Sequence, residues 1–362
     1  MSANPRSPQR ISATKVIDEA VTVVVVNYRT PQLTAKCLAA LQQERPSFRK
    51  FRAMLVDGGS DDGSAEELSS LIQKSEMAEW VAFLPLPING GFGWANNQAI
   101  QRAMCSPEPP QYIHLLNPDT EIEQGAVRSL AEYLNKNPRV AAVGSQLLEQ
   151  DGSLSGSAFS FPTIRGEVAR VARTGALERI LRVPPISVNA SAPAEVDWVT
   201  GASVMLRVSA LRDVGLFDEG FFLYNEEIEL MWRLRKAGWS IATEPASRVG
   251  HVGGVATGVH GRGTTGPVDP RRPAYVYRSR TRMFGLTSGR TMTALAFGAW
   301  LVGYAVWQMR HFIGLGKGKP LERELRDHIL KAFPRHHDFV SAAVGLDDPP
   351  TNIPAWMENR WL

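Results

Sequence analysis

The sequence has only two cysteines, Cys37 and Cys105, among its 362 residues. Neither belongs to a CxxC pair or lies near a histidine cluster, so the sequence offers no disulfide framework and no zinc site of the usual spacing. It also has little excess of either charge, because 40 lysines and arginines against 36 aspartates and glutamates give a formal net charge of +4. So small an imbalance gives no indication of nucleic acid binding, and two cysteines fit a reducing compartment.

The first 20 residues lack a long apolar stretch. They are polar and rich in proline and serine, without the hydrophobic region of a secretory signal peptide. We therefore expect residues 1–20 to form a disordered leader. The apolar share of the whole chain, 44%, is that of a globular protein with a sizeable core.

What the sequence does have is a regular alternation of buried strands and helices. The β-branched run VTVVVVNY (21–28) is typical of a strand buried on both faces of a parallel sheet. Three more apolar runs, FRAMLVD, VAFLPL and YIHLLN, alternate with helical patterns over the first 120 residues. This order predicts an α/β fold with a doubly wound sheet, whose polar loops follow the carboxyl ends of the strands, where such sheets bind ligands.

Past Pro138 the pattern changes. Residues 140–161 predict strands joined by a DG turn, residues 166–195 form a mixed basic and proline-rich insertion, and residues 196–208 predict a strand pair. A helix ending before Gly238 and a strand leading to His251 follow. The glycine-rich residues 253–273 have the composition of a lid that closes over a substrate or of simple disorder, and the sequence leaves both open.

Two aspartates stand where predicted strands end. Asp57 is followed by glycines that let a ligand approach the backbone, although turn chemistry explains the same residues equally well. In LLNPDTEI (115–122), Pro118 keeps Asn117 out of helical geometry and leaves Asp119 at the same edge of the sheet. One or two carboxylates plus substrate phosphates are enough to hold Mg²⁺ or Mn²⁺, so Asp119 is a candidate metal ligand.

The glycine-rich loop NGGFGWANN (89–97) lacks the spacing of a P-loop or of a dinucleotide fingerprint. Its asparagines suggest base or ribose contacts, or simply positions in the first turn of a helix. The helix NEEIELMWRLRKAG begins with Glu226 and Glu227, as a helix dipole favours, and also contains an ordinary i,i+4 pair of Glu229 with Arg233. Exposed aromatics before these acids are less easily explained. His251 is a strand-end histidine or a ligand.

Taken in order, the motifs VVVVNYRT, MLVDGGSDDGS, NGGFGWANNQA, HLLNPDTEI, DWVTGASVMLR, GLFDEGFFLYNEEIELMWRLRKAGW and HVGG resemble the inverting glycosyltransferases of family 2, in particular the rhamnosyltransferase-like branch. The resemblance covers about residues 21–255 and implies a GT-A fold. It divides the catalytic domain (21–273) into a Rossmann-like nucleotide-sugar half at 21–137 and an acceptor half at 138–273. Residues 274–362 would form a C-terminal helical extension.

The resemblance also implies roles for individual residues. Glu227 would be the catalytic base, with Glu226 as second choice, since the family has a Glu-Asp pair here. Asn117 replaces the first aspartate of the family's DxD motif, so the divalent cation, Mg²⁺ or Mn²⁺, would be held by Asp119, with His251 near the metal or the diphosphate. Donor contacts would come from Asn27, Tyr28, Asp57, Asn89, Gly91 and Asn96. In the mechanism that we expect, Arg262, Arg278 or Arg280 beyond His251 would help Asp119 and its cation to neutralise the diphosphate.

Residues 291–309 carry no charge and are bracketed by Arg290 and Arg310. A stretch of this length with internal tryptophans fits a helix in a membrane interface, a contact with a partner such as a second copy, or a buried core helix. Membrane contact would make a lipid-linked saccharide acceptor natural. We expect a cytoplasmic protein, and membrane contact would place it at the inner face of the plasma membrane.

Together these features predict a transferase that moves a sugar, L-rhamnose from dTDP-rhamnose, onto a cell-envelope glycan or its lipid-linked precursor. One alternative keeps the fold and uses a UDP-hexose or furanose donor. A second is a scaffold that binds nucleotide-sugar or glycan without catalysis, and a third is a nucleotidyltransferase. Two carboxylates at 226 and 227 argue against the scaffold, because a binder needs no base.

Overall fold

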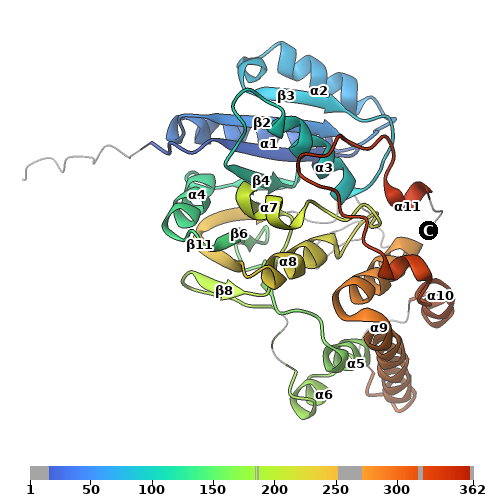
Figure 1. Ribbon diagram of the computed structural model, residues 1–362. Helices are drawn as coiled ribbons and strands as arrows, with labels where there is room; N and C mark the ends of the chain where they lie inside the picture. The colour runs from blue at the N-terminus through green and yellow to red at the C-terminus, as the bar shows by residue number, and fades with distance from the viewer. Residues whose placement is uncertain (1–15, 184, 186, 252–270, 317–320, 359–362) are drawn as a thin grey trace, which may run out of the picture.

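The computed structural model describes residues 16–183, 185, 187–251, 271–316 and 321–358 (Figure 1). Its centre is one mixed sheet of nine strands, namely β1 (Val21–Asn27), β2 (Phe51–Asp57), β3 (Val81–Pro85), β4 (Tyr112–Leu116), β5 (Thr120–Ile122), β6 (Val140–Leu148), β8 (Ala194–Val196), β10 (Ser203–Arg207) and β11 (Ser240–His251). The strand order is β3-β2-β1-β4-β10-β6-β11-β5, and β8 pairs with β11. Two short strands, β7 (Ala158–Phe159) and β9 (Trp198–Val199), pair separately.

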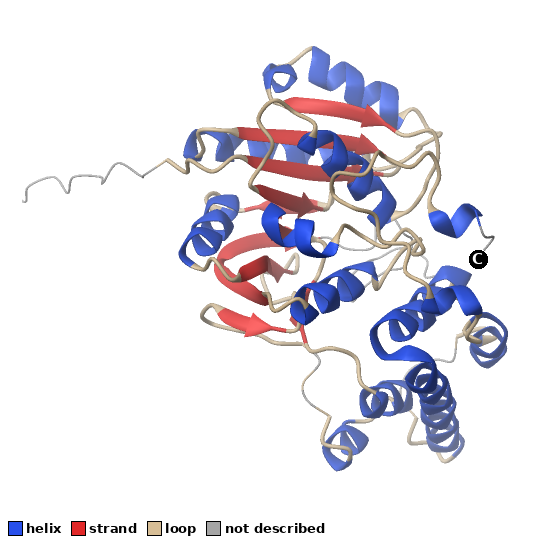
Figure 2. Cartoon of the chain, in the orientation of Figure 1, coloured by secondary structure: helices blue, strands red, loops and turns tan. Residues whose placement is uncertain are grey.

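Helices cover both faces of this sheet (Figure 2). One face packs against α1 (Pro31–Glu44), α2 (Ser64–Gln73) and α4 (Ala126–Lys136), and the other against α3 (Phe92–Met104), α7 (Val208–Val214) and α8 (Glu226–Lys236). Successive residues of β1 point to opposite faces, so Val23 and Val25 join the first core while Val24 joins the second. The predicted doubly wound α/β architecture is confirmed.

The sheet runs without a break through both predicted halves of the catalytic domain. β1 lies parallel between β2 and β4, and β10 extends the sheet by pairing antiparallel with both β4 and β6. The strand pair predicted at 196–208 is wrong in its partners, because β9 and β10 belong to different sheets. The disordered leader was predicted too long. Ile17 is buried in the core, and its N–H donates to Ser47 O at 2.9 Å.

A helical layer lies to one side of the sheet (Figure 1). It contains α5 (Ile164–Ala172), α6 (Gly175–Ile180), the 39-residue α9 (Ala274–Phe312) and α10 (Glu324–Lys331). The short helices η1 (Arg45–Ser47), η2 (Glu76–Glu79), η3 (His336–Phe339) and α11 (Ala355–Glu358) complete the described structure. Helix α9 is kinked at Gly289, and its second half contains the uncharged stretch 291–309. There Gly303 lets α9 touch α5, since a Cβ at this position would lie 2.6 Å from Val168 O.

Candidate active site

Two polar side chains meet where the first two strands end. The parallel register places Asn27 of β1 beside Asp57 of β2. The Asn27 amide donates to Asp57 Oδ1 at 2.8 Å, and the Ser60 N–H donates to Asp57 Oδ2 at 2.9 Å. Both side chains are buried. Asp57 therefore stabilises the turn that follows β2, which is one of the two roles that the sequence left open. Contact of Asp57, Asn27 or Tyr28 with a nucleoside stays a prediction.

The loop after Asp57 contacts the loop before α3. Gly59 has a φ of 72°, and a Cβ there would lie 2.4 Å from the carbonyl carbon of Ile88, so only glycine fits. This contact holds Asn89 close to the ends of β1 and β2. Asn89 Oδ1 accepts a hydrogen bond from the Gly91 N–H at 3.1 Å, which shapes the glycine loop from within.

Gly91 fixes how the loop before α8 crosses the start of α3. Its φ is 91°, and a Cβ would lie 1.9 Å from the carbonyl oxygen of Phe222. The Phe92 N–H donates to that same oxygen at 3.1 Å, so the two loops are held together. Asn96 is buried, and its amide donates to Phe92 O at 2.9 Å within its own helix. This bond agrees with the interpretation that Asn96 simply lies in the first turn of a helix. Contact of Asn96 with the nucleotide-sugar stays a prediction.

The end of the sheet brings together the two residues for which a metal role was predicted. His251 of β11 pairs with Thr120 of β5, which places His251 Nε2 3.4 Å from Asp119 Oδ1. Asp119 is buried, and His251 Nε2 has no hydrogen-bond partner among the described residues. A carboxylate facing an unpartnered imidazole nitrogen fits a cation site.

Two ligands do not make a complete cation site. The described residues contain no group of three or more His, Cys, Asp or Glu arranged to hold a metal ion. Any cation at Asp119 would therefore take its other ligands from water or from substrate phosphates, as Mg²⁺ commonly does. The chemistry of the pair fits that arrangement.

Helix α8 begins with two carboxyl groups that are withheld from water. Glu226 is buried and Glu227 half-buried, and Oε2 of each has no hydrogen-bond partner in the described part of the chain. Burial raises the pKa of Glu227 to about 7, and burial together with the Glu227 charge raises the pKa of Glu226 well above its usual value. Glu226 also lies beside the start of α3, since a Cβ at Gly93 would be 3.7 Å from Glu226 Cγ.

Unsatisfied buried carboxyls are costly, so a folded protein that keeps two of them side by side usually uses them. The residues just before them are strained as well. Tyr224 and Asn225 have φ values of 70° and 69°, in the left-handed region that side chains other than glycine rarely adopt. The pair at the start of α8 therefore has the environment of a general base that is partly protonated near neutral pH.

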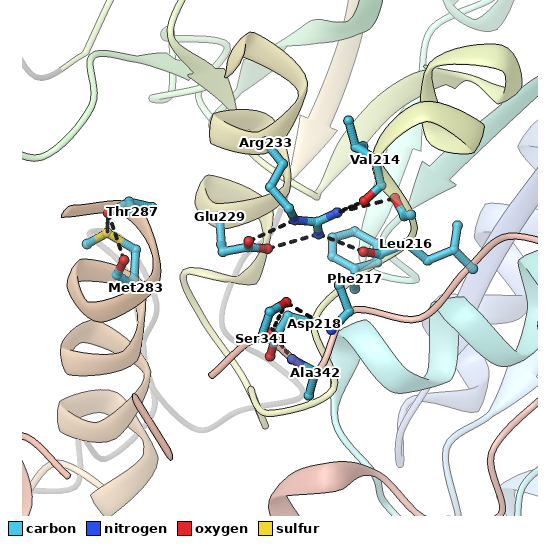
Figure 3. A network of polar contacts seen from close by, with 12 residues as sticks. Val214, Leu216, Phe217, Asp218, Glu229, Arg233, Met283, Thr287, Ser341 and Ala342 are labelled. Atoms are coloured by element: carbon cyan, nitrogen blue, oxygen red, sulfur yellow. Dashed lines mark hydrogen bonds and ion pairs between the residues drawn. The ribbon is translucent and has the colours of Figure 1, made fainter. Parts of the chain in front are cut away.

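A network of polar contacts anchors the helix that carries this pair (Figure 3). Arg233 binds Glu229 through two hydrogen bonds of 2.7 and 2.9 Å, which confirms the predicted i,i+4 pair. The same guanidinium donates to Leu216 O at 2.6 Å and to Val214 O at 2.5 Å. Helix α8 is thereby fixed to the end of α7 and to the loop that crosses α3.

Asp218 extends this support to the C-terminal segments. Its Oδ1 accepts from Arg282 Nη2 at 2.7 Å and its Oδ2 from the Ala342 N–H at 2.7 Å, near the Ser341 contact drawn in Figure 3. Sequence reasoning missed this residue. The motif DEGFFLYNEE signals a loop before a helix, but no local pattern reveals that its first aspartate binds an arginine 64 residues away.

The predicted arginine contacts to donor phosphate receive no support. Arg278 is buried against the C-terminal segment, where it donates to Lys331 O at 2.6 Å and Phe333 O at 3.2 Å. Arg280 forms an ion pair with the buried Glu167 of α5. Arg262 and most of the predicted lid at 253–273 lie outside the described residues.

Comparison with known proteins agrees with this geometry. The sequence model described as "Glycosyl transferase family 2" matches residues 22–214. The chain belongs to that family. This glycosyltransferase is 31% identical over 256 residues to the N-acetylglucosaminyl-diphospho-decaprenol L-rhamnosyltransferase of Mycobacterium tuberculosis, a match that covers 66% of the chain and 78% of the relative. The predicted resemblance to the rhamnosyltransferase-like branch is confirmed.

The chain also resembles a more distant sequence relative and two solved structures. The Staphylococcus epidermidis poly-beta-1,6-N-acetyl-D-glucosamine synthase is 24% identical to this glycosyltransferase, over 51% of the chain and 40% of the relative. A mannosyltransferase from Pyrobaculum calidifontis, solved with GDP-Man and Mn²⁺, superposes with a TM-score of 0.50 at 12% identity, covering 90% of this chain and 84% of that one. GalNAc-T7, solved with UDP, GalNAc and Mn²⁺, gives 0.51 at 15%, covering 74% and 48%. These likenesses confirm the GT-A fold.

Proposed function

We propose that this glycosyltransferase transfers L-rhamnose from dTDP-rhamnose, with inversion, to a hydroxyl of a lipid-linked precursor of a cell-envelope glycan. The observation that carries the proposal is the carboxyl pair Glu226–Glu227. One oxygen of each is buried without a hydrogen-bond partner among the described residues, and the pair begins helix α8 beside the glycine loop. The choice of sugar and acceptor follows the printed name of the mycobacterial relative.

Inversion requires a base on the face of the donor sugar opposite the leaving diphosphate. Glu227 takes this role, because a carboxyl with a pKa of about 7 is a stronger base than an exposed glutamate and is still half deprotonated at neutral pH. It removes the proton from the acceptor hydroxyl as that oxygen attacks the anomeric carbon. Glu226, next to it, has a pKa raised by burial and by the charge of Glu227, and it is the second choice for the base.

On the donor side, Asn27 and Asp57 close the nucleoside end of the site, and Asn89 and Gly91 border it. Asp119 and His251 would hold a divalent cation against the diphosphate. Such a cation stabilises the negative charge that grows on the leaving group. The solved structural neighbours contain Mn²⁺, which supports a divalent cation without naming the one used here.

The test is titration calorimetry of the full chain with dTDP-rhamnose, UDP-glucose and UDP-galactofuranose, each with Mn²⁺, with Mg²⁺ and with EDTA. We expect dTDP-rhamnose to bind in the presence of metal and the UDP-sugars to bind at least about tenfold more weakly. Preference for a UDP-sugar would change the donor, and absence of binding to every donor would leave the scaffold as the better description. Proton NMR of the product then reports whether the anomeric configuration is inverted.

We also propose that the protein works on the cytoplasmic face of a membrane, where a lipid-linked acceptor resides. Helix α9 is long and apolar enough to cross a bilayer by length and composition, with 33% of its most apolar window buried. The partial burial and the contact of α9 with α5 favour a helix that lies in the interface over one that spans it. Contact with a second copy of the chain is the competing use of the same surface.

A further inference from the structure

A cavity of about 150 Å³ lies within the helical layer, between α5, α9 and α10. Its wall includes Tyr224 and Asn225, the strained residues that immediately precede Glu226. The cavity therefore opens onto the segment that carries the candidate base, although none of its lining residues comes from the strand ends that form the donor side. The cavity has room for a small charged head group.

The cavity carries an excess of positive charge. Glu167 of α5 is buried and is shared by two arginines of the lining, with Arg170 Nη2 2.9 Å and Arg280 Nε 2.9 Å from its Oε2. Arg272 also lines the cavity and forms no ion pair with a carboxylate among the described residues, since Asp327 nearby is bound by Arg271. Glu324, the next acidic group on α10, is paired with Arg173 at 3.5 Å. Glu324 is buried close enough to act on Arg170, so three guanidiniums lie near two carboxylates. The remaining positive charge favours an anionic ligand.

One polar atom in the wall lacks a partner. His328 of α10 lines the cavity and is 6% exposed, yet its Nε2 has no hydrogen-bond partner among the described residues. Burial lowers the pKa of His328 to about 4, so the ring is neutral at physiological pH. Its one N–H is used in a hydrogen bond to the Phe297 backbone, which leaves Nε2 as an acceptor. A buried acceptor nitrogen without a donor points to a ligand that brings a hydroxyl group, such as the sugar of the acceptor, beside its charged head.

A row of aromatic rings connects His328 in the cavity wall with the protein surface. Trp300 stacks on His328 with centroids 3.8 Å apart, and Phe297 stacks on the same ring at 4.8 Å. Phe297 in turn contacts Phe333 at 5.9 Å, and Phe333 is 61% exposed. Helices α9 and α10 also carry further exposed apolar side chains, which we call the apolar surface, namely Met292, Leu295, Val302, Leu325, Ile329 and Leu330.

We propose that this cavity is the acceptor site and that it binds the diphosphate head of an isoprenoid lipid. The diphosphate contacts Arg170, Arg272 and Arg280, the tail leaves over Phe297 and Phe333 toward the apolar surface, and the acceptor sugar extends past Tyr224 toward Glu227. The inference rests on the proposed function and adds to it the place where the acceptor is recognised. It also assigns a use to Arg280 other than the predicted donor contact.

The experiment is calorimetric titration of the full chain, in EDTA, with farnesyl diphosphate, inorganic pyrophosphate and farnesol. EDTA removes the cation through which a diphosphate would bind at Asp119, and the Asp119→Ala variant should bind farnesyl diphosphate like the wild type. We expect farnesyl diphosphate to bind at least about tenfold more tightly than pyrophosphate or farnesol, because only it occupies both parts of the cavity. Equal binding of pyrophosphate would overturn the lipid assignment.

Two variants locate the site, and one serves as control. Arg272→Gln removes a partly exposed cation and should weaken farnesyl diphosphate binding about tenfold. Phe297→Ala should reduce binding of farnesyl diphosphate but not of pyrophosphate. Arg326→Gln removes an exposed arginine of α10 that does not line the cavity, and should have no effect. Equal losses in Arg272→Gln and Arg326→Gln would mean that only general surface charge is involved.

A diazirine-bearing analogue of farnesyl diphosphate gives a readout that does not depend on any variant. Crosslinks should map to residues 293–300 and 328–333, and crosslinks confined to other segments would contradict the proposal. Binding of dTDP-rhamnose with Mn²⁺ is measured on the same protein. If the donor binds and farnesyl diphosphate does not, the acceptor site is wrong while the proposed function stands. If no nucleotide-sugar binds, the proposed function itself fails.

Discussion

At the scale of single residues, Glu227 is the candidate base, and burial raises its pKa. Replacing it by glutamine keeps the shape of the side chain and removes the base, so we expect kcat to fall by about 10²- to 10⁴-fold while donor affinity is unchanged. Glu226→Gln should have a smaller effect. Glu121→Gln, which changes an exposed carboxyl on β5, is the control and should leave kcat as it is. If Glu226→Gln is the more damaging change, the roles of the two residues are exchanged.

The same carboxyl sets a pH dependence. The base works only when deprotonated, so kcat should rise as pH increases through about 7, the pKa of Glu227, and level off above it. The rise should disappear in the residual activity of Glu227→Gln. A pH profile measured between 5 and 9, with donor and acceptor saturating, checks this. A profile that is flat across neutral pH would exclude a carboxyl of raised pKa as the base.

Stability should respond to pH in the opposite sense. The pKa of Glu227 is raised from 4.5 to about 7 on folding, so between these values the folded state binds more protons than the unfolded state. The free energy of unfolding therefore falls as pH rises through this window. Glu227→Gln removes that penalty and should raise Tm at pH 8 while leaving it almost unchanged at pH 4, as scanning calorimetry would reveal. An equal shift at both pH values would point to packing instead.

Asp119 gives the sharpest test of the cation site. Asp119→Asn keeps the size of the side chain but removes the charge that faces His251, so Mn²⁺-dependent donor binding should weaken by at least about tenfold. Binding measured in EDTA should be the same for wild type and variant. Glu121→Gln, two residues along, should retain full metal dependence. A variant that still responds to Mn²⁺ like the wild type would remove Asp119 from the site.

At the scale of elements, the site depends on how the loop before α8 is anchored. Asp218 and Arg282 form a buried pair, with side chains 0% and 2% exposed, that ties this loop to α9. Removing Asp218 leaves the charge of Arg282 buried without its carboxylate. Asp218→Ala should therefore lower the free energy of unfolding by about 3–5 kcal/mol in urea titrations. The exposed pair Arg248–Glu123 is the matched control, where Glu123→Ala should cost under about 1 kcal/mol.

The elements themselves were largely predictable, whereas their long-range pairings were not. The β-branched run of β1 and the proline after Thr30 are local signals, and both elements formed where the sequence placed them. The contact of Asp119 with His251 joins residues far apart in sequence, and the spacing of neither motif reveals it. The helix α5 was missed although its start carries a signal, since Thr163 Oγ1 accepts from the Gly166 N–H at 3.1 Å as an N-cap does.

Polar residues inside helices were harder to interpret. Asn96 and Asn97 look like surface positions of α3, yet both are buried, and the Asn97 amide donates to Phe217 O at 2.9 Å. Nothing in a single sequence separates an asparagine that supports a neighbouring loop from one that meets a ligand. Sequence patterns thus identify the carboxylates that follow strands, while the support of the site comes from contacts that only the folded chain creates.

At the scale of the whole molecule, the apolar surface of α9 and α10 lies on the same helical layer as the proposed acceptor cavity. A lipid-linked acceptor would be reached most directly if that layer rested on the bilayer, and Arg290 and Arg310 flank the apolar part of α9. We expect the full chain to sediment with vesicles that contain anionic lipid, and to remain bound in part at high salt, because apolar contact is not screened.

Substitutions on the exposed face of α9 test that placement without disturbing the core. Leu295→Asp and Val302→Asp change residues that are 52% and 56% exposed, and together they should reduce vesicle binding by at least about tenfold through lost apolar burial and added repulsion. Leu154→Asp changes an equally apolar, exposed side chain in the turn after β6 and should have no effect. Light scattering tests whether this surface binds a second copy of the chain instead. The surface would be assigned to a dimer if the wild type is dimeric, the α9 substitutions dissociate it, and the wild type does not bind vesicles.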